Sequence, residues 1–183
     1  GYHAHVERLL GLAGFSKRRA AAAAAEVLAV ETALAKVSMS KVDRRDPRKM
    51  YNKRDRKGLA ADAPKVAWKA YLAALKLAEV KDFNVSSPAF FKGLSKLLAS
   101  KKPRAFRSYL TWQLLHAYAP ALSEDFVKEG FALQKLLTGQ KAQQPRWKRC
   151  VAATDQALGE LLAQSFVAKR FAGDSKKTVT EMV

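Results

Sequence analysis

The sequence has few of the residues that build most catalytic centres. It contains a single cysteine, Cys150, which excludes a disulfide within the chain, and only three histidines among its 183 residues. It has no His-Glu-x-x-His motif, no glycine-rich phosphate loop and no Gly-x-Ser-x-Gly motif. By these patterns we expect no catalytic residue in this chain.

The histidines do not suggest a metal site. His3 and His5 are two residues apart, so on a helix they point about 200° apart and cannot easily share a metal. His116 stands alone near an expected helix end. A catalytic zinc needs three protein ligands around one open position. We interpret all three histidines as structural or surface residues and expect no metal ligand in this chain.

Cys150 is the remaining candidate for nucleophilic chemistry. It follows Trp147-Lys148-Arg149, and neighbouring positive charge lowers the pKa of a cysteine thiol. No histidine is near it in the sequence, although one could approach in space. We therefore favour a buried or externally paired cysteine over a nucleophile.

Acidic residues and long apolar runs are also scarce. The chain has 16 Asp and Glu but 34 Lys and Arg, which gives a net charge of +18. Such a charge attracts nucleic acid, an anionic membrane surface or an acidic sister domain. No run of 18 apolar residues predicts a membrane span. No signal peptide is visible. Because the chain opens on Gly-Tyr rather than Met, we expect a fragment or a processed product.

Helix breakers are few, and this predicts a mainly α fold, a multi-helix array with short connections and no convincing strand. Glycine and proline total 15, and alanine runs from Ala20 to Ala25. Caps and apolar spacing place the helix boundaries: we interpret Ser16, Asp46 and Asp55 as N-caps, and Gly14 and Gly139 as helix ends. We expect helices over 2–14, 16–37 and 48–52, a turn ending near 60, about a dozen residues from Trp68, and further helices from Pro88, over 103–119 and 123–139, over 145–172, and from Asp174 or Ser175 to Val183.

The longest expected helix, of about 27 residues from Pro145 to Ala172, would span roughly 40 Å at the usual rise per residue. An apolar stripe follows one face of it, and we expect that stripe to be buried. Its members are Trp147, Val151, Leu158, Leu161, Leu162 and Phe166.

The stretch from Lys41 to Lys57 is the best candidate for a binding surface. It holds nine basic and three acidic residues, with Tyr51 as its only aromatic. Polyanion binding needs basic residues on one face. A solvated charged surface is the simpler interpretation, and Arg45-Asp46 and Asp55 could equally form internal ion pairs. Two other basic clusters would extend the surface if they converged in space; they are Lys101, Lys102, Arg104, Arg107 and Arg146, Lys148, Arg149.

Several motifs follow one another along the chain in an order that can be compared with known protein families. The sequence has Val27 to Ala35, Arg44-Arg45-Asp46-Pro47, Tyr51-Asn52-Lys53, Trp68-Lys69-Ala70-Tyr71-Leu72, Tyr109 to Leu115, Trp147-Lys148-Arg149-Cys150, and Phe171-Ala172-Gly173-Asp174-Ser175-Lys176. Together they resemble the non-catalytic helical region of the neprilysin and endothelin-converting-enzyme family of zinc metallopeptidases. The resemblance covers essentially residues 1–183.

The resemblance implies a two-lobed enzyme whose lobes enclose a water-filled chamber. One lobe holds zinc, and the other, like this chain, screens the site and restricts substrates to peptides. The zinc ligands and the general-base glutamate would then lie downstream of Val183, and the arginine that binds the substrate carboxylate would lie upstream of Gly1. The cysteine aligned with Cys150 pairs, in animal members, with an upstream cysteine.

The resemblance also implies partners and a location. The partners would be the catalytic zinc lobe of the same polypeptide and peptide substrates, and the location would be secreted or periplasmic. The +18 charge is unusual for such a family. The alternative is a stand-alone basic helical module that binds nucleic acid or another polyanion, although we do not expect nucleic acid to be the partner.

Overall fold

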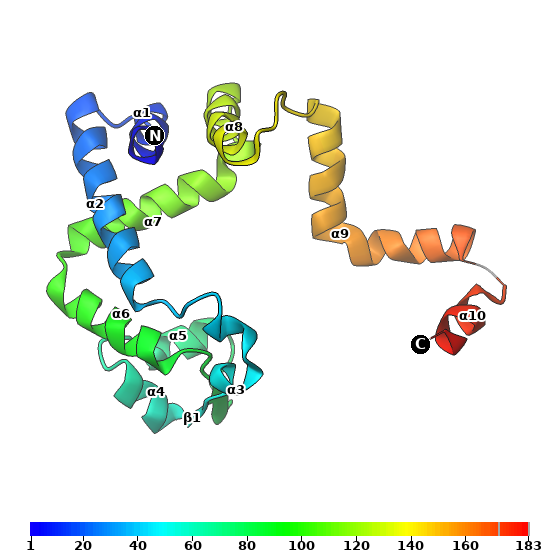
Figure 1. Ribbon diagram of the computed structural model, residues 1–183, viewed down its shortest axis with the longest axis horizontal. Helices are drawn as coiled ribbons and strands as arrows, with labels where there is room; N and C mark the ends of the chain where they lie inside the picture. The colour runs from blue at the N-terminus through cyan, green and yellow to red at the C-terminus, as the bar shows by residue number, and fades with distance from the viewer. Residues whose placement is uncertain (172, 183) are drawn as a thin grey trace. The chain divides into compact units, whose positions relative to one another are not determined.

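The computed structural model describes residues 1–171 and 173–182, and these residues divide into two compact units, 1–133 and 134–183. In the first unit, α2 (Lys17–Val37) is the central element. The helix α1 (Tyr2–Leu12) and the helix α7 (Pro103–Tyr118) pack against one half of it, and α6 (Pro88–Ser100) packs near its other end (Figure 1). The prediction of a mainly helical array is confirmed.

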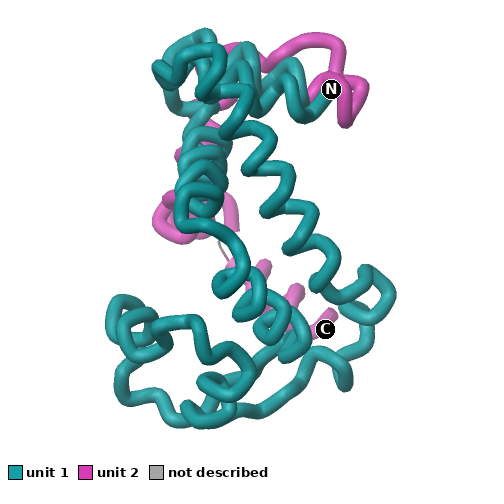
Figure 2. The backbone as a smooth tube through the Cα atoms, turned by 90° about the vertical axis from the view of Figure 1, so that its left-hand side faces the viewer, with its two compact units in different colours: residues 1–133 teal, residues 134–183 magenta. Residues whose placement is uncertain are grey.

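Short elements fill the remainder of the first unit, at the end of α2 where α6 lies. They are η1 (Asp43–Arg45), α3 (Pro47–Met50), β1 (Lys53–Asp55), α4 (Arg56–Asp62), α5 (Trp68–Ala74) and β2 (Asp82–Asn84). The short η2 (Ala119–Ala121) instead follows α7. The helix α8 (Glu124–Thr138) crosses the boundary between the units, and α9 (Arg146–Arg170) and α10 (Ser175–Glu181) complete the second unit (Figure 2).

Local sequence signals set most helix ends. Asp46, Asp55 and Ser87 each accept a hydrogen bond from a backbone N–H in the first turn of the helix that follows. The helices α3, α6 and α7 begin with proline, as expected. Gly14, with φ of +88°, ends the first helical segment because glycine adopts this left-handed conformation without a Cβ penalty.

Two apolar clusters hold the first unit together. The larger lies between α1, α2 and α7, where small alanines of α2 let the neighbouring helices approach closely. Its members are Val6, Leu9, Leu10, Ala20, Ala23, Ala24, Val27, Trp112 and Ala119. The smaller cluster, Leu59, Leu72 and Val85, lies among the short elements and is covered by Trp68, Phe83 and Phe91.

In the first unit, the structure differs from the expected secondary structure among the short elements. Strands β1 and β2 pair antiparallel, with Arg54 opposite Phe83, where no strand was expected. Three-residue strands are too short to show apolar alternation, so the sequence carries no signal for them. The helix from Trp68 spans seven residues rather than a dozen, because the chain turns at Lys76, which has a φ of +57°.

The long C-terminal helix also differs from expectation. It ends at Arg170, and its backbone is non-helical at Leu158, with φ of −127° and ψ of 15°. A single straight helix of roughly 40 Å is therefore wrong. The expected ends at Ala172 and Val183 lie outside the described residues.

Candidate functional site

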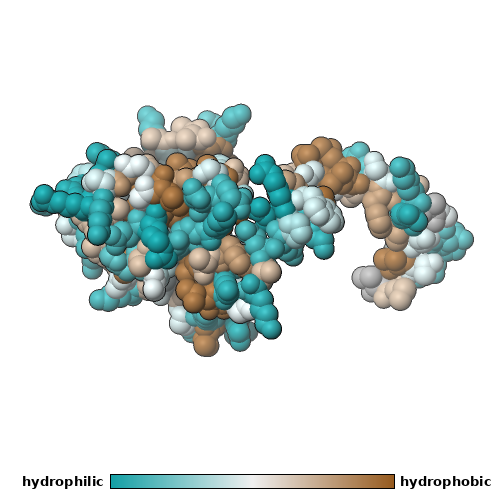
Figure 3. Space-filling model, turned by 90° about the horizontal axis from the view of Figure 1, so that it is seen from above, coloured by the Kyte–Doolittle hydropathy of each residue, from teal (hydrophilic) through white to brown (hydrophobic). Residues whose placement is uncertain are grey.

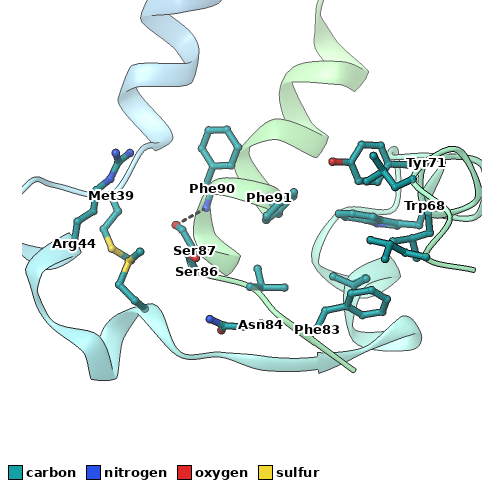
Figure 4. Close-up of a pocket in the computed structure, with 16 residues that line it drawn as sticks. Met39, Arg44, Trp68, Tyr71, Phe83, Asn84, Ser86, Ser87, Phe90 and Phe91 are labelled. Atoms are coloured by element: carbon teal, nitrogen blue, oxygen red, sulfur yellow. Dashed lines mark hydrogen bonds between the residues drawn. The ribbon is translucent and has the colours of Figure 1, made fainter. Parts of the chain in front are cut away.

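An apolar pocket with a volume of about 630 Å³ lies in the first unit at the end of α2 (Figure 4). Met39, from the segment that follows α2, forms one wall (Figure 4), and Met50 of α3 also lines the pocket. The rings of Trp68 and Tyr71 form the opposite wall, and the small apolar cluster also lines the pocket. The lining residues are Met39, Arg44, Met50, Leu59, Trp68, Tyr71, Leu72, Leu75, Leu77, Phe83, Asn84, Val85, Ser86, Ser87, Phe90 and Phe91.

Ring contacts hold the aromatic wall in place. The Trp68 ring lies 5.4 Å from the Phe91 ring and 6.1 Å from the Tyr71 ring, centroid to centroid. The indole N–H of Trp68 donates to the backbone carbonyl of Ala63 at 3.0 Å. Such pairs and a satisfied indole fix ring orientation, so the aromatic wall is preformed.

The histidine candidates have different environments. His3 is exposed. His5 is buried at 2% exposure, and its Nδ1 lies 2.7 Å from Glu129 Oε1. His116 is exposed, but its ring stacks on Trp112 at 5.0 Å and lies 6.3 Å from the His5 ring, so it does not stand alone. The interpretation of His5 as a structural residue agrees with this packing.

Glu129 and Arg8 complete a polar cluster that the sequence did not reveal. Arg8 donates from Nε and Nη2 to the two Glu129 oxygens, each at 2.8 Å. Burial lowers the pKa of His5 despite the raising effect of Glu129. Burial alone would raise the pKa of Glu129, but the hydrogen bonds from Arg8 and His5 lower it. The cluster joins α1 to α8.

Metal-ligating side chains do not gather in the described chain. Across residues 1–171 and 173–182, no three His, Cys, Asp or Glu side chains lie close enough to form a metal site. The Nε2 atom of His5 is buried without a hydrogen-bond partner among these residues. A nitrogen in that position, with one carboxylate on the other side of the ring, is only one potential ligand and does not make a zinc site.

Cys150 lies on α9 and is exposed, so the expectation of a buried cysteine is wrong. All three histidines belong to the first unit, whereas Cys150 belongs to the second. Pairing with a cysteine outside this chain stays a prediction.

The basic stretch from Lys41 to Lys57 is partly engaged within the fold. Lys49 pairs with Asp43, Arg54 pairs with Asp62 at 2.8 Å, and Lys53 lies 3.2 Å from Asp82. The guanidinium of Arg56 donates to the Val80 carbonyl. These partners reduce the charge available to a polyanion.

Two aspartates of this stretch, Asp46 and Asp55, cap helices as expected. Asp46 and Asp55 form no ion pair among the described residues, so the alternative that they form internal ion pairs is wrong. Of the other clusters, Arg104 pairs with Glu26 at 3.0 Å, and Arg146, Lys148 and Arg149 lie on α9 in the second unit.

The apolar stripe of α9 is exposed, which corrects the expectation that it is buried. Trp147 is 64% exposed and Leu158 is 48% exposed, and no element of the described second unit packs along the helix. Apolar side chains are visible on the surface of this unit (Figure 3). The exposed members are Trp147, Val151, Leu158, Leu161, Leu162 and Phe166.

An apolar helix face of this size is typical of a surface that another part of a protein covers. The structure therefore defines a basic helical module with a preformed apolar pocket, an exposed apolar helix and, among the described residues, no metal-ligand cluster. In the same residues, no helix is both long and apolar enough to cross a membrane.

Comparisons with known proteins show to which family this module is related. The N-terminal model for peptidase family M13 matches residues 1–183. Neprilysin-2 of Drosophila melanogaster is 34% identical over 172 residues, covering 85% of this chain and 22% of the relative. Human endothelin-converting enzyme 1 is 28% identical over 163 residues, covering 86% of this chain and 21% of the relative.

Solved structures agree with the sequence comparisons. The cryo-EM structure of Mycobacterium tuberculosis zinc metalloprotease Zmp1 in its open state matches with a TM-score of 0.91 and 28% identity, over 98% of this chain and 28% of that chain. Its crystal structure with an inhibitor matches with a TM-score of 0.90. The chain belongs to peptidase family M13, and it spans about a fifth of the length of the curated relatives.

Proposed function

We propose that this chain is the non-catalytic helical part of a zinc metalloendopeptidase, where it encloses the active-site chamber and restricts substrates to peptides. The observation that carries the proposal is the match of nearly the whole chain, with a TM-score of 0.91, to only 28% of the zinc metalloprotease Zmp1. A match of this kind favours one structural part of a larger enzyme over an enzyme complete in itself.

Zinc does not fit the residues of this chain. The sequence has no His-Glu-x-x-His, and the described residues bring no three suitable ligands together. In the proposal, the zinc is held by the catalytic lobe of the same polypeptide, where it would polarise the scissile carbonyl and a bound water. This chain would contribute walls that shape and limit access to that site.

The exposed apolar surface supports a role inside a larger assembly. Trp147, Leu161 and Phe166 on α9 are each more than 60% exposed, as are Leu110 on α7 and Leu136 on α8. Large apolar side chains gathered on helix faces favour coverage by further polypeptide. The proposed partner is therefore the remainder of the same enzyme, and the proposed location, by resemblance to the family, is outside the cytoplasm.

The screening role is tested by comparing substrates of the intact polypeptide. A short peptide and the same sequence placed in an exposed loop of a folded carrier are offered at equal concentration. An unrelated protease with an open cleft serves as the control that the loop can be cut. We expect the intact enzyme to cut the peptide and spare the carrier, and equal cleavage of both would reject screening by this part.

The non-catalytic assignment has its own test. The isolated chain, washed with chelator and dialysed against zinc, should retain no stoichiometric zinc by metal analysis and should cleave no peptide. Tightly bound zinc or peptidase activity in the pure chain would show that the chain carries a catalytic site.

A further inference from the structure

We propose that the pocket lined by Met39, Trp68 and Phe91 is a binding site for an amphipathic carboxylate, with its apolar body in the pocket and its anion on Arg44. The inference rests on this chain alone and does not depend on the proposed protease function. The volume of this pocket, about 630 Å³, falls within the range of sites that hold drug-sized ligands, about 300–1,000 Å³.

The walls favour an apolar ligand of variable shape. Trp68, Tyr71 and Phe91 provide a preformed aromatic surface, held by the ring contacts described above. Met39 faces them across the pocket (Figure 4), and Met50 is a second methionine of the lining. Thioether side chains are flexible and polarisable, so this wall can adapt to different ligands.

The charge of the lining selects an anion. Arg44 is the only charged residue among the sixteen that line the pocket, and no carboxylate lines it. The Arg44 side chain is exposed and has no hydrogen-bond or ion-pair partner among the described residues, although nearby Lys49, Arg54 and Arg56 are engaged. A guanidinium pairs well with a carboxylate because its N–H groups match the two oxygens.

Neutral donors lie on the same pocket. Asn84 uses its side-chain oxygen to accept from the backbone N–H of Asn52, which leaves its NH₂ group without a partner among the described residues. The hydroxyl of Ser86 also lacks one. These groups add hydrogen-bond donors to the lining at places separate from the Arg44 guanidinium (Figure 4), so Arg44 alone supplies the charge contact to an anion. Two kinds of ligand carry a carboxylate on an apolar body: a free fatty or aryl acid, and the C-terminal residue of a peptide.

Calorimetry on the full-length polypeptide, stripped of metal by a chelator so that carboxylates cannot bind zinc, tests the site. The probes are decanoate with 1-decanol as its uncharged match, and N-acetyl-Leu-Phe with its C-terminal amide. We expect decanoate or the dipeptide acid to bind more tightly than its uncharged match, and the tighter of the two acids identifies the kind of ligand. Equal binding within both pairs, or no binding by any probe, would overturn the proposal.

Variants assign the effect to the pocket. Arg44→Gln should weaken the carboxylate probes about three- to tenfold and leave 1-decanol unchanged, because it removes an exposed charge contact only. Arg45→Gln is the matched control, since Arg45 is also exposed but does not line the pocket. Tyr71→Ala should weaken charged and uncharged probes alike. Equal effects of the two arginine variants would overturn the role of Arg44.

Cross-linking gives the location independently. A decanoate analogue with a photoreactive diazirine on its chain, added to the same full-length polypeptide, should label the peptides that contain Met39, Met50 or Trp68. Excess decanoate should suppress that labelling, and Tyr71→Ala should reduce it. Competed labelling that falls only on other segments would show that the carboxylate binds elsewhere.

Discussion

The Nδ1 atom of His5 lies 2.7 Å from the Oε1 atom of Glu129, although 124 residues separate them in the sequence. This contact joins the first helix of the chain to α8, and Arg8 holds the same carboxylate through two further hydrogen bonds. His5 is buried, with Glu129 on Nδ1 and no hydrogen-bond partner on Nε2 among the described residues, so this junction is sensitive to protonation of the ring.

The first prediction is that the stability of the first unit falls as the pH falls below about 6.5. Burial lowers the pKa of His5 from its ordinary value of 6.5, so the unfolded chain binds this proton more readily than the folded chain. The lowered pKa of Glu129 acts in the same direction below about 4.5. Denaturant titrations from pH 7 to pH 5 measure the slope.

Two histidine variants identify the source of this dependence. His5→Gln should flatten the slope between pH 7 and pH 5, because glutamine does not titrate. His3→Gln, in the same helix but exposed, should leave the slope as it is. An unchanged slope in the His5 variant would mean that other groups set the acid sensitivity.

The second prediction concerns the contact of α6 with α2. A Cβ atom at Gly93 would lie 2.5 Å from Cγ1 of Val37, far inside a normal contact. Gly93→Ala should therefore lower the free energy of unfolding by about 1–3 kcal/mol. Adding Val37→Ala should recover part of the loss. Gly11→Ala, where the new Cβ meets no atom within 4 Å, should be neutral or stabilising; equal loss at both glycines would reject the crowding argument.

The third prediction concerns the helix cap at Asp46, whose carboxylate accepts from the backbone N–H of Arg48 at 2.9 Å. Asp46→Ala should lower the free energy of unfolding by roughly 1 kcal/mol, whereas Asp46→Asn should cost much less because it keeps the acceptor. Thermal melts of the two variants measure this difference. If both melt like the parent chain, the cap contributes nothing to stability.

The features that the sequence predicted are local ones. The cap at Asp46, the helix start at Pro88 and the turn at Gly14 each depend on a few adjacent residues, and each agrees with the structure. The family resemblance is confirmed over the whole chain because it rests on the order of many such segments.

The features that the sequence did not predict depend on distant residues. Nothing near His5 in the sequence indicates Glu129 as its partner, and the pocket brings together Met39, Trp68 and Phe91 from three separate segments. Apolar spacing also cannot tell which element covers a stripe. The stripe of α9 is periodic, as expected of a buried helix, but the described chain provides nothing to cover it.

The fourth prediction concerns the basic charge. If the Lys41–Lys57 stretch is a surface whose charges are partly paired within the fold, binding to a random DNA duplex should be weak and should vanish near physiological salt. Lys49, Arg54 and Arg56 have partners in the structure, which supports this outcome. Fluorescence anisotropy over a salt series measures it, and sub-micromolar affinity at about 150 mM salt would favour the polyanion-binding alternative.

The last prediction uses one substitution in two contexts. Leu158 is 48% exposed at the break in α9, so Leu158→Asp in the isolated chain should change the free energy of unfolding by no more than about 0.5 kcal/mol. Leu10→Asp is the control, because Leu10 is fully buried and an unpaired charge there should unfold the first unit. In the intact polypeptide, the proposed coverage of α9 makes the same Leu158→Asp change costly, and the melting temperature should drop. A Leu158→Asp variant that is equally harmless in both contexts would show that the rest of the enzyme does not cover Leu158.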